Sequence, residues 1–371
     1  MSELYIGALS GTSMDAVDAA LVRFDPLPRL VSATGLPYPA SLRAELTALA
    51  TPGPDEIDRL GQADVRVGRH FAAAIAALLA EAGVTKTSVR AIGSHGQTLR
   101  HRPRLEAPFT LQIGDPNVIA VETGLPVVAD FRRKDMALGG QGAPLVPAFH
   151  EAVFRSAHRD RIVLNIGGIA NVTVLPARSD FTVTGFDTGP GNTLLDRWCH
   201  RVTGEPMDRD GQLAAAGQVR PDLLARLQSD AYFHQPPPKS TGPEQFTLEW
   251  VDAHLAALGP VGSSADVQAT LLALTAETIG AEIRRLPGIV APDVFVCGGG
   301  ARNPVLMQAL QRALPGSKVD RTEALGVPGE WVEAMAFAWL ARQHLEKRPG
   351  NLPAVTGARR LAVLGGLFLP E

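Results

Sequence analysis

The chain opens with an apolar run, a short polar turn and a second apolar run. Residues 4–9 are mostly apolar, residues 10–15 are rich in Gly, Ser, Thr and Asp, and apolar side chains return at Val17, Leu21 and Val22. This pattern is typical of a β-hairpin whose strands pack on a core and whose tip is polar. We expect this hairpin to begin the first half of the fold.

The same pattern returns near the middle of the chain. Residues 161–166 have the composition of a strand, Gly167 and Gly168 form a turn, and residues 169–175 resemble a return strand. Two such hairpins, each opening one half of the chain, predict a duplicated α/β unit. If the two halves face one another, both turns converge on one cleft.

Longer segments between and after these hairpins have the apolar spacing of helices. They are residues 55–82, which end before Gly83, residues 264–285, and residues 330–346, with Glu333 near the first turn. The apolar stripe of each segment recurs at about the helical period, so we expect it to pack on a core. Glu333 either interacts with the helix dipole or reaches a binding site.

The first polar turn carries groups that suit phosphate binding. Gly11 has no Cβ, so it can adopt a positive φ and leave the amides of Thr12 and Ser13 open to an anion. Asp15 and Asp18 add carboxylates that suit a hydrated divalent cation. An ordinary Ser/Thr-rich turn with solvated aspartates explains the same residues equally well, and the turn lacks the lysine of a P-loop.

A second glycine-rich turn follows a predicted buried strand at residues 293–297. Gly298, Gly299 and Gly300 come next, and a helix begins near Pro304. Such a turn lets a phosphate or a flat base approach the helix amino terminus. Tight strand-to-helix packing is an equally good explanation, and the turn does not match the dinucleotide-binding pattern G-x-G-x-x-G.

Asp187 follows a predicted strand at residues 181–186 and precedes a Gly/Pro turn and a helix. One interpretation is that Asp187 caps the helix or the turn. The other is that it is a general base placed beside a phosphoryl acceptor.

Other polar residues stand in turns or at the ends of short predicted strands. They are His95, Gln97, Asp115 and Asp130. Residues at such positions in α/β proteins commonly face a ligand, although turn formation or surface hydrogen bonding explains them too. The Gly-rich stretch at residues 139–144 breaks regular structure, and we interpret it as a hinge between lobes.

Composition narrows the class of protein. The 371 residues are 45% hydrophobic and 20% charged, as expected for a folded globular chain, and the formal net charge of −3 argues against a dedicated nucleic-acid binder. Cys199 and Cys297 lack metal-ligand spacing and favour a reducing compartment. No signal peptide or membrane-spanning run is apparent, so a cytoplasmic location without membrane attachment is expected.

Taken in order along the chain, these motifs resemble those of the anhydro-N-acetylmuramic acid kinases, a family in the actin, Hsp70 and sugar-kinase superfamily. The motifs that carry the resemblance are Ser10-Gly-Thr-Ser-Met-Asp15-Ala-Val-Asp18, Ser94-His-Gly-Gln-Thr98, Gln112-Ile-Gly-Asp115, Ala129-Asp-Phe-Arg132, Gly139-Gly-Gln-Gly-Ala-Pro-Leu-Val-Pro147, Leu164-Asn-Ile-Gly-Gly-Ile-Ala-Asn-Val-Thr173, Phe186-Asp-Thr-Gly-Pro-Gly-Asn192, Lys239-Ser-Thr-Gly242, Cys297-Gly-Gly-Gly-Ala301 and Glu333-Ala-Met-Ala-Phe337. Each motif alone is weakly specific, but their shared order is highly specific.

The resemblance implies an α/β protein with the two-lobed actin-like ATPase fold, built from duplicated ribonuclease-H-like domains. The expected N-terminal lobe is residues 1–136 plus 349–371, and the expected C-terminal lobe is residues 137–348, with nucleotide and sugar in the cleft between them. The implied reaction uses ATP, Mg²⁺ and one water to convert 1,6-anhydro-N-acetylmuramic acid into N-acetylmuramic acid 6-phosphate, a step in the recycling of cell-wall peptidoglycan. A homodimer is expected from the same resemblance.

The resemblance also assigns roles to residues. Asp187 is the expected catalytic base, and Asp15 is the expected metal ligand, directly or through water. The expected nucleotide-binding residues are Gly11, Thr12, Ser13, Met14, Asp15, Ala16, Val17, Asp18, Gly167, Gly168, Gly298, Gly299 and Gly300. The expected sugar-binding residues are His95, Gln97, Asp115, Asp130, Arg132 and Glu333, with Arg132 suited to the lactyl carboxylate.

Three positions depart from the family pattern. Ala16 stands where Gly is usual, Met207 where Tyr is common, and Met14 where Leu is commoner. Two other functions stay open at this point: a kinase for another carbohydrate or small acid, and a nucleotide-gated binding protein.

Overall fold

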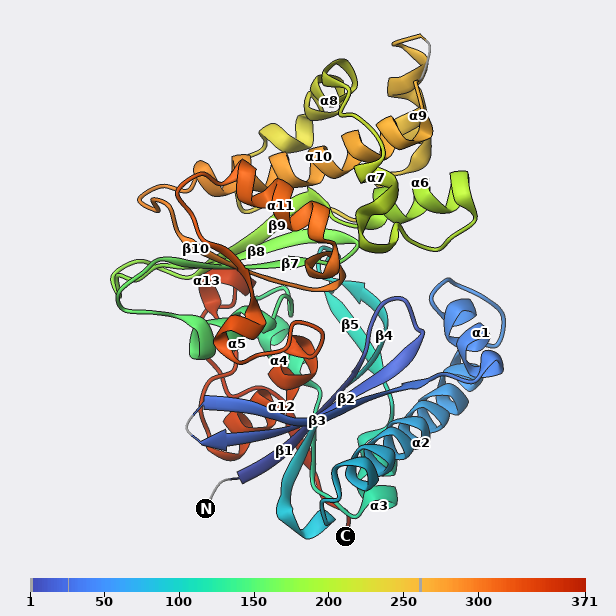
Figure 1. Ribbon diagram of the computed structural model, residues 1–371. Coiled ribbons are helices and arrows are strands. Elements are labelled where there is room, and N and C mark those ends of the chain that lie inside the picture. Colours follow the sequence, from blue (N-terminus) through green and yellow to red (C-terminus); the bar gives the residue numbers. More distant parts are fainter. Residues whose placement is uncertain (1–2, 26, 260–261) are drawn as a thin grey trace. The chain divides into compact units, whose positions relative to one another are not determined.

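The computed structural model describes residues 3–25, 27–259 and 262–371. The chain divides into two compact units (Figure 1). Unit 1 comprises residues 1–153 and 331–371, and unit 2 comprises residues 154–330. Each unit has a β-sheet and a buried hydrophobic core of its own.

Unit 1 is built on a mixed sheet. Among its described residues, seven strands follow the order β12-β6-β4-β1-β2-β3, with β5 paired to β4. The strands are β1 (Glu3–Ser10), β2 (Ala16–Asp25), β3 (Leu27–Pro37), β4 (Val89–Arg102), β5 (Phe109–Ile113), β6 (Val127–Ala129) and β12 (Gly366–Phe368). The helices are α1 (Ala40–Leu49), α2 (Glu56–Ala82), α3 (Pro116–Thr123), α4 (Phe131–Ala137), α5 (Val146–Phe154), α12 (Val332–Leu345) and α13 (Pro353–Thr356), with a short 3₁₀ turn η1 (Lys86–Ser88).

Unit 2 has a smaller sheet in the order β11-β10-β7-β8-β9. The strands are β7 (Arg161–Ile166), β8 (Ile169–Leu175), β9 (Thr184–Pro190), β10 (Asp293–Cys297) and β11 (Val319–Arg321). The helices are α6 (Thr193–Thr203), α7 (Gln212–Ala215), α8 (Pro221–Gln228), α9 (Leu248–Ala256), α10 (Ser264–Arg284) and α11 (Pro304–Ala313). Short 3₁₀ turns are η2 (Arg209–Gly211), η3 (Ala231–His234), η4 (Gly299–Arg302) and η5 (Thr322–Leu325).

The two sheets share one topology. In unit 1, β3, β2 and β1 are antiparallel neighbours, and β4 and β6 continue the sheet in parallel with β1. In unit 2, β9, β8 and β7 are antiparallel, and β10 and β11 continue in parallel with β7. The predicted duplication is therefore confirmed, because each half begins with the predicted hairpin and repeats the strand order of a ribonuclease-H-like domain.

The long helices also lie where their apolar periodicity predicts. Helix α2 spans Glu56–Ala82 and ends at Gly83, whose φ of 62° is the left-handed conformation that glycine adopts at helix ends. Helix α10 spans Ser264–Arg284 and starts with a capping box formed by Ser263 and Asp266. Helix α12 spans Val332–Leu345.

Helix α12 lies unusually close to the sheet of unit 1. Gly7 on β1 and Gly93 on β4 are partners in the sheet register. A Cβ at Gly7 would lie 1.8 Å from the carbonyl oxygen of Ala334, and a Cβ at Gly93 would lie 2.0 Å from that of Phe337. Only glycine permits this approach, so these two residues set the position of the helix that carries Glu333.

The limits of the units differ from the expected lobes, because the segment at residues 139–142 is held within unit 1. The buried carboxylate of Asp135 accepts hydrogen bonds from Gly142 N at 2.9 Å, Asn351 Nδ2 at 2.8 Å and Thr356 Oγ1 at 2.8 Å. These bonds tie the predicted hinge to the C-terminal segment. The unit boundary lies further along the chain, after Val153.

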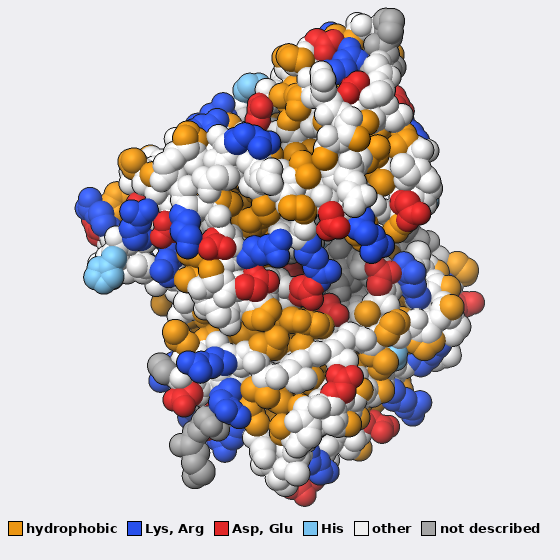
Figure 2. All heavy atoms as spheres, in the orientation of Figure 1, with side chains coloured by type: hydrophobic (Ala, Val, Ile, Leu, Met, Phe, Trp, Pro, Cys, Tyr) orange, Lys and Arg blue, Asp and Glu red, His pale blue; other side chains and the backbone are white. Residues whose placement is uncertain are grey.

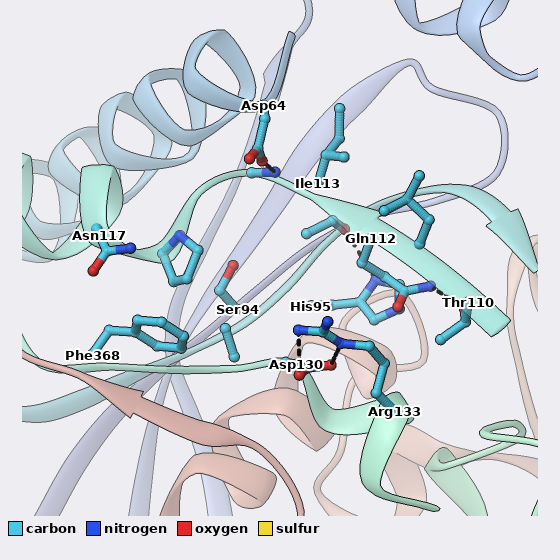
Figure 3. A pocket seen from close by; sticks show the side chains of 15 residues that line it. Asp64, Ser94, His95, Thr110, Gln112, Ile113, Asn117, Asp130, Arg133 and Phe368 are labelled. Atoms are coloured by element: carbon cyan, nitrogen blue, oxygen red, sulfur yellow. Dashed lines mark hydrogen bonds and ion pairs between the residues drawn. The ribbon is translucent and has the colours of Figure 1, made fainter. Parts of the chain in front are cut away.

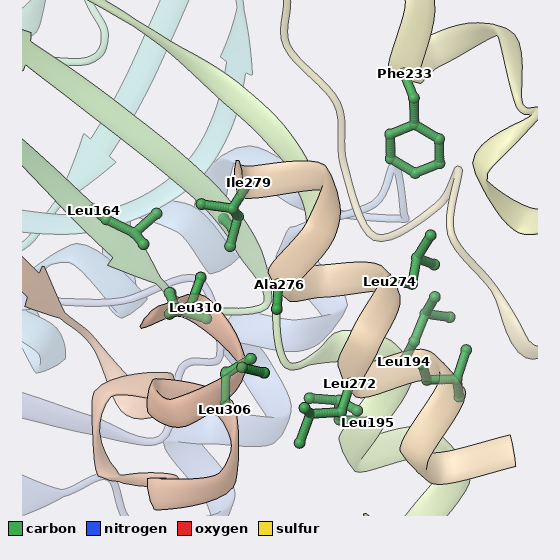
Figure 4. Packing of buried hydrophobic residues seen from close by; sticks show 14 of the residues in the cluster. Leu164, Leu194, Leu195, Phe233, Leu272, Leu274, Ala276, Ile279, Leu306 and Leu310 are labelled. Atoms are coloured by element: carbon green, nitrogen blue, oxygen red, sulfur yellow. The ribbon is translucent and has the colours of Figure 1, made fainter. Parts of the chain in front are cut away.

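The core of unit 2 gathers around α10 (Figure 4). Leu164 on β7 lies on one side, Leu306 and Leu310 on α11 lie on another, and Leu194 and Leu195 on α6 face the helix further along. Burying each such side chain contributes about 1.5–3 kcal/mol. This packing holds the sheet and the following helices as one body.

Charged side chains of both signs are interspersed on the face shown in Figure 2. Among the described residues, no helix combines the length and apolar character that spanning a membrane requires. Cys199 and Cys297 are both buried.

Candidate active site

The first polar turn joins β1 to β2, as predicted. Met14 N donates to Gly11 O at 3.1 Å, and the positive φ of the turn, 55°, falls on Met14 rather than on Gly11. The expectation of a positive φ at Gly11 is therefore wrong. A Cβ at Gly11 would still meet no protein atom within 4 Å, so glycine here serves access to the backbone and not the shape of the turn.

Gln97 on β4 supports this turn through hydrogen bonds. Its Nε2 donates to Gly11 O at 3.2 Å and to Thr98 O at 3.1 Å, and the side chain is fully buried. Within the described residues, Gln97 Oε1 has no hydrogen-bond partner. The structure therefore places Gln97 beneath the turn, where it holds the backbone of Gly11.

The two carboxylates of the turn have different surroundings. Asp15 is more than half exposed and forms an ion pair with Arg43. Asp18 is partly buried on β2, and burial raises the pKa of its carboxyl group above the usual range. Within the described part of the chain, no hydrogen bond or ion pair engages the Asp18 carboxylate, so it is the better placed of the two to accept a cation.

A cluster of polar residues lies beside α12. Arg132 Nε donates to His95 Nε2 at 2.9 Å, and Arg132 Nη1 donates to Gly142 O at 2.8 Å. Burial lowers the pKa of Arg132 to about 10, against the opposing charges of Glu333 and Asp135. The side chain of Glu333 is exposed to solvent. Desolvation by the surrounding protein raises the pKa of its carboxyl group, and the Arg132 charge opposes that rise.

His95 is neutral in this cluster. Burial, and then the Arg132 charge, hold the pKa of His95 well below its usual value. Because Nε2 accepts the Arg132 hydrogen bond, the proton resides on Nδ1, which donates to Gly96 O at 3.0 Å. The ring also packs on Phe337, with centroids 4.6 Å apart. His95 is thus suited to orienting Arg132.

A cavity of about 290 Å³ lies in unit 1, where the middle of β4, the strand β5 and the end of β6 line it (Figure 3). His95 and Asp130, two of the predicted sugar-binding residues, line it, and Asp130 forms an ion pair with Arg133 at 2.7 Å. Asp64 on α2 also lines it and accepts a hydrogen bond from Gly114 N at 2.6 Å. Burial raises the pKa of Asp64.

Asp115 has a structural partner. It is the N-cap of α3, and its Oδ1 accepts from Asn117 N at 2.8 Å and from Asn117 Nδ2 at 3.0 Å. The neighbouring residues Gly114 and Pro116 line the cavity, but Asp115 itself does not. Its position in the sequence does not show whether Asp115 caps a helix or lines the cavity.

The glycine turns of unit 2 lie side by side. Gly191 N and Thr193 N donate to Gly168 O, and Asn192 N donates to Gly167 O. A Cβ at Gly298 would lie 2.8 Å from Ile166 O, the last residue of β7 before the Gly167 turn. The turns at residues 167–168 and 298–300 therefore meet at the carboxyl ends of the parallel strands β7 and β10.

Asp187 lies within β9 and not after a strand, because β9 begins at Thr184 and pairs with β8 through Asn171 and Asp187. It does not cap α6, whose N-cap is Asn192. Asp187 Oδ2 accepts a hydrogen bond from Thr241 N at 3.0 Å. Burial raises the pKa of Asp187, and the Thr241 N–H bond opposes that rise.

Three features of these surroundings were missed by sequence reasoning. Asp64 sits in a helix that was interpreted as core packing alone, and Ser94 was noted only as part of a motif. Lys239 enters the sequence analysis only as part of a motif, yet its side chain is only 2% exposed and forms an ion pair with Glu282. A lysine between prolines and hydroxyl residues was the available signal, but its partner lies 43 residues away.

The two units have sheets of the same topology, each with a polar or glycine-rich turn at its first hairpin. This duplication defines the actin-like class of ATPases and sugar kinases. The family model for anhydro-N-acetylmuramic acid kinase matches residues 3–370. The chain belongs to the anhydro-N-acetylmuramic acid kinase family.

Relatives of that name are similar over almost the full length. An anhydro-N-acetylmuramic acid kinase from Shewanella amazonensis is 55% identical over 366 residues, covering 98% of each chain. One from Coxiella burnetii is 50% identical over 369 residues, covering 100% of this chain and 98% of the relative. A solved structure of xylulose kinase from Rhodospirillum rubrum aligns with a TM-score of 0.47 at 15% identity, covering 100% of this chain and 94% of that one.

Proposed function

We propose that this protein is an ATP-dependent kinase that opens 1,6-anhydro-N-acetylmuramic acid with water and phosphorylates O6. The products are N-acetylmuramic acid 6-phosphate and ADP. Family membership over residues 3–370 supports the substrate. The observation that carries the chemistry is Asp187, a partly buried carboxylate with a raised pKa on β9, in the unit that also holds two adjoining glycine turns.

The anhydro sugar requires an unusual base. O6 is part of an internal acetal and has no proton, so a base cannot activate it directly. Instead, Asp187 takes a proton from water as the water oxygen bonds to C1. The C1–O6 bond breaks, and O6 bonds to the γ-phosphorus as the bond to ADP breaks. A general base in such a step contributes about 10²–10⁴-fold.

The raised pKa of Asp187 suits this role. A carboxylate that binds a proton more strongly is a better base, provided that it is ionised at the working pH. Thr241 N–H stabilises the ionised form through its hydrogen bond. Burial thus strengthens the carboxylate as a base, and the Thr241 N–H bond limits the rise in its pKa.

The glycine turns supply phosphate contacts in this proposal. The amides of residues 11–13 are accessible because a Cβ at Gly11 meets no protein atom within 4 Å. The turn at Gly167–Gly168, whose carbonyl oxygens accept hydrogen bonds from residues 191–193, binds phosphate oxygens through its amides. The turn at Gly298–Gly300 lies beside the adenosine. Phosphoryl transfer depends chiefly on such positioning and charge neutralisation.

The residues of the first turn fit a magnesium ion. Mg²⁺ is commonly held by one or two carboxylates together with phosphates and water. Asp18 has a carboxylate without a protein partner among the described residues, and Asp15 would exchange its exposed ion pair with Arg43. When bound, the ion neutralises phosphate charge.

The sugar contacts centre on Arg132, Glu333 and the residues around them. Arg132 Nε and Nη1 already donate to His95 and Gly142, which leaves Nη2 to meet the lactyl carboxylate. Glu333 is available for a sugar hydroxyl, and His95 and Asp130 face the adjoining cavity.

The proposed enzyme is a cytoplasmic homodimer.

Mass spectrometry of the product formed in ¹⁸O-labelled water tests the proposal. The protein, ATP, Mg²⁺ and anhydro sugar should yield a 6-phosphate with one ¹⁸O at C1 and none in the phosphate. Because the anomeric hydroxyl of the product exchanges slowly with water, short reactions are compared with unlabelled product placed in the same water. Phosphorylation of only those hexosamines that carry a free 6-hydroxyl would contradict the proposal.

A further inference from the structure

A buried lysine lies behind the Asp187 site in unit 2. Lys239 Nζ donates to Glu282 Oε1 at 3.0 Å and to Tyr232 O at 3.0 Å. The two charged side chains are 2% and 4% exposed. Lys239 Nζ also lies 4.6 Å from the centre of the Tyr232 ring. The lysine thus joins its loop to α10 and to η3.

The same loop holds Asp187 at several points. Asp187 N donates to Lys239 O at 3.1 Å, and Thr241 N donates to Asp187 Oδ2 at 3.0 Å. From η3, Tyr232 Oη donates to Asp187 O at 2.7 Å. The backbone and the carboxylate of Asp187 are therefore held by the two segments that Lys239 Nζ connects.

Net stability is a weak explanation for this ion pair. Removing two charges from water costs several kcal/mol per ion, and replacing a buried pair by apolar residues is often neutral or stabilising. A buried pair can instead select one geometry, because each partner is costly to leave unpaired. Here the selected geometry is that of the loop which reaches Asp187.

We propose that Lys239, through its ion pair with Glu282, is a positioning residue that holds the Thr241 N–H on the Asp187 carboxylate. The proposal rests on the proposed function, in which Asp187 is the base. Lys239 does not touch the reacting atoms. It acts by fixing the loop of residues 239–241 against β9 and α10.

This arrangement has a consequence for proton binding. The titratable and charged groups around Asp187 are Tyr232 on η3, Lys239 on the loop and Glu282 on α10. Arg285, at the end of α10, also forms an ion pair with Glu282 at 3.4 Å. Burial raises the pKa of Asp187, and the Thr241 N–H bond lowers it. If the loop loses its anchor, the lowering effect weakens and the pKa of Asp187 rises further. The active, ionised base then appears only at higher pH.

The test compares Lys239→Met with the unaltered protein. We expect kcat to fall about 10- to 100-fold, as a misplaced base requires, while the KM for ATP changes less than about twofold. The acid limb of the kcat–pH profile should move upward by about half a pH unit or more, since hydrogen bonds to a carboxylate shift its pKa. Lys239→Arg, which keeps the charge, should restore part of kcat.

Two further variants separate positioning from folding. Lys318→Met removes a lysine of the same unit whose ion pair with Asp320 is exposed, and it should leave kcat and the pH profile unchanged. The double variant Lys239→Met, Glu282→Leu removes both buried charges and should regain stability towards denaturant. Its kcat should stay low, because the anchor of the loop is still missing.

The outcomes decide the inference separately from the proposed function. A stable Lys239→Met variant with unchanged kcat and unchanged acid limb would overturn it, as would full recovery of kcat in the double variant. An NMR titration of the Asp187 carboxyl group measures the pKa without turnover, and an unmoved value in Lys239→Met would also overturn the inference. Absence of phosphoryl transfer by the unaltered protein would instead count against the proposed function.

Discussion

The two units place a single carboxylate at the same cross-strand pair, but on different strands. In unit 1, Asp18 on β2 lies opposite Gly35 on β3. In unit 2, Asn171 holds the corresponding place on β8 and lies opposite Asp187 on β9. The duplicated sheet therefore supplies the same location twice, with the carboxylate on β2 in unit 1 and on β9 in unit 2.

The first hairpin turns of the two units also differ in the protein atoms that surround them. The turn of unit 1 is open at Gly11, where a Cβ would meet no protein atom within 4 Å. The turn of unit 2 is closed by backbone hydrogen bonds from residues 191–193, and a Cβ at Gly191 would lie 2.4 Å from Gly167 O. The first turn is open at its own glycine, while the second is bordered by the segment after β9, where Gly191 permits the close approach.

The sheets are also covered in different ways. Gly7 and Gly93 are partners on β1 and β4, and they let α12 approach the backbone of the sheet. At the corresponding place in unit 2, Val163 on β7 lies four residues before Gly167, and its partner on β10 is Phe295. Their large side chains would obstruct so close an approach of a helix backbone, which the glycines of unit 1 allow.

The largest effect should come from removing the carboxylate that distinguishes unit 2. Asp187→Asn should lower kcat by about 10²–10⁴-fold or more, because an amide cannot accept the proton of the attacking water. Nucleotide binding, measured by calorimetry, should stay near normal. Asp18→Asn makes unit 1 resemble unit 2 and should instead raise the KM for ATP and Mg²⁺. Near-normal turnover in Asp187→Asn would refute the assignment of the base.

A smaller effect, on stability, should follow from filling the glycine contact of unit 1. Gly93→Ala places a Cβ 2.0 Å from Phe337 O, so α12 must shift. Overpacking of this kind costs about 1–3 kcal/mol and occasionally more, which denaturant unfolding would measure. As a control, Gly61→Ala lies at an exposed position of α2, where a Cβ would meet no atom within 4 Å, and it should stabilise by about 0.5–1 kcal/mol. If both variants changed the free energy of unfolding equally, α12 would be able to shift without loss of stability, and the prediction would be wrong.

The smallest effect on folding is expected at the open turn. Gly11→Ala should change the free energy of unfolding by less than about 0.5 kcal/mol, as is usual where a new group meets no neighbour. The KM for ATP should still rise about tenfold, a cost of about 1.4 kcal/mol, because the methyl group obstructs phosphate. Gly191→Ala should show the opposite pattern and lose stability first. An unchanged KM in Gly11→Ala would mean that phosphate does not approach this residue.

Local patterns predicted much of the architecture. The hairpins at residues 4–22 and 161–175 and the helices α2, α10 and α12 were predictable, because their apolar residues alternate or recur at the helical period. The order of short motifs was specific enough to indicate the family. The roles of Asp187 and the glycine turns follow from that family and stay proposals to be tested by the variants above.

Other features required the folded chain, because they depend on residues distant in sequence. The Lys239–Glu282 pair, the contact of Gly93 with α12 and the place of Asp64 at the cavity are of this kind. The limits of the units belong here too, since Asp135 binds Asn351 and Thr356 across more than 200 residues. Amino-acid order by itself determined the strands, the helices and the repeated hairpins, since these depend on neighbours within about a dozen positions. Only tertiary structure decided which side chains are buried together, because desolvation and hydrogen bonding act between groups that the folded chain brings into contact.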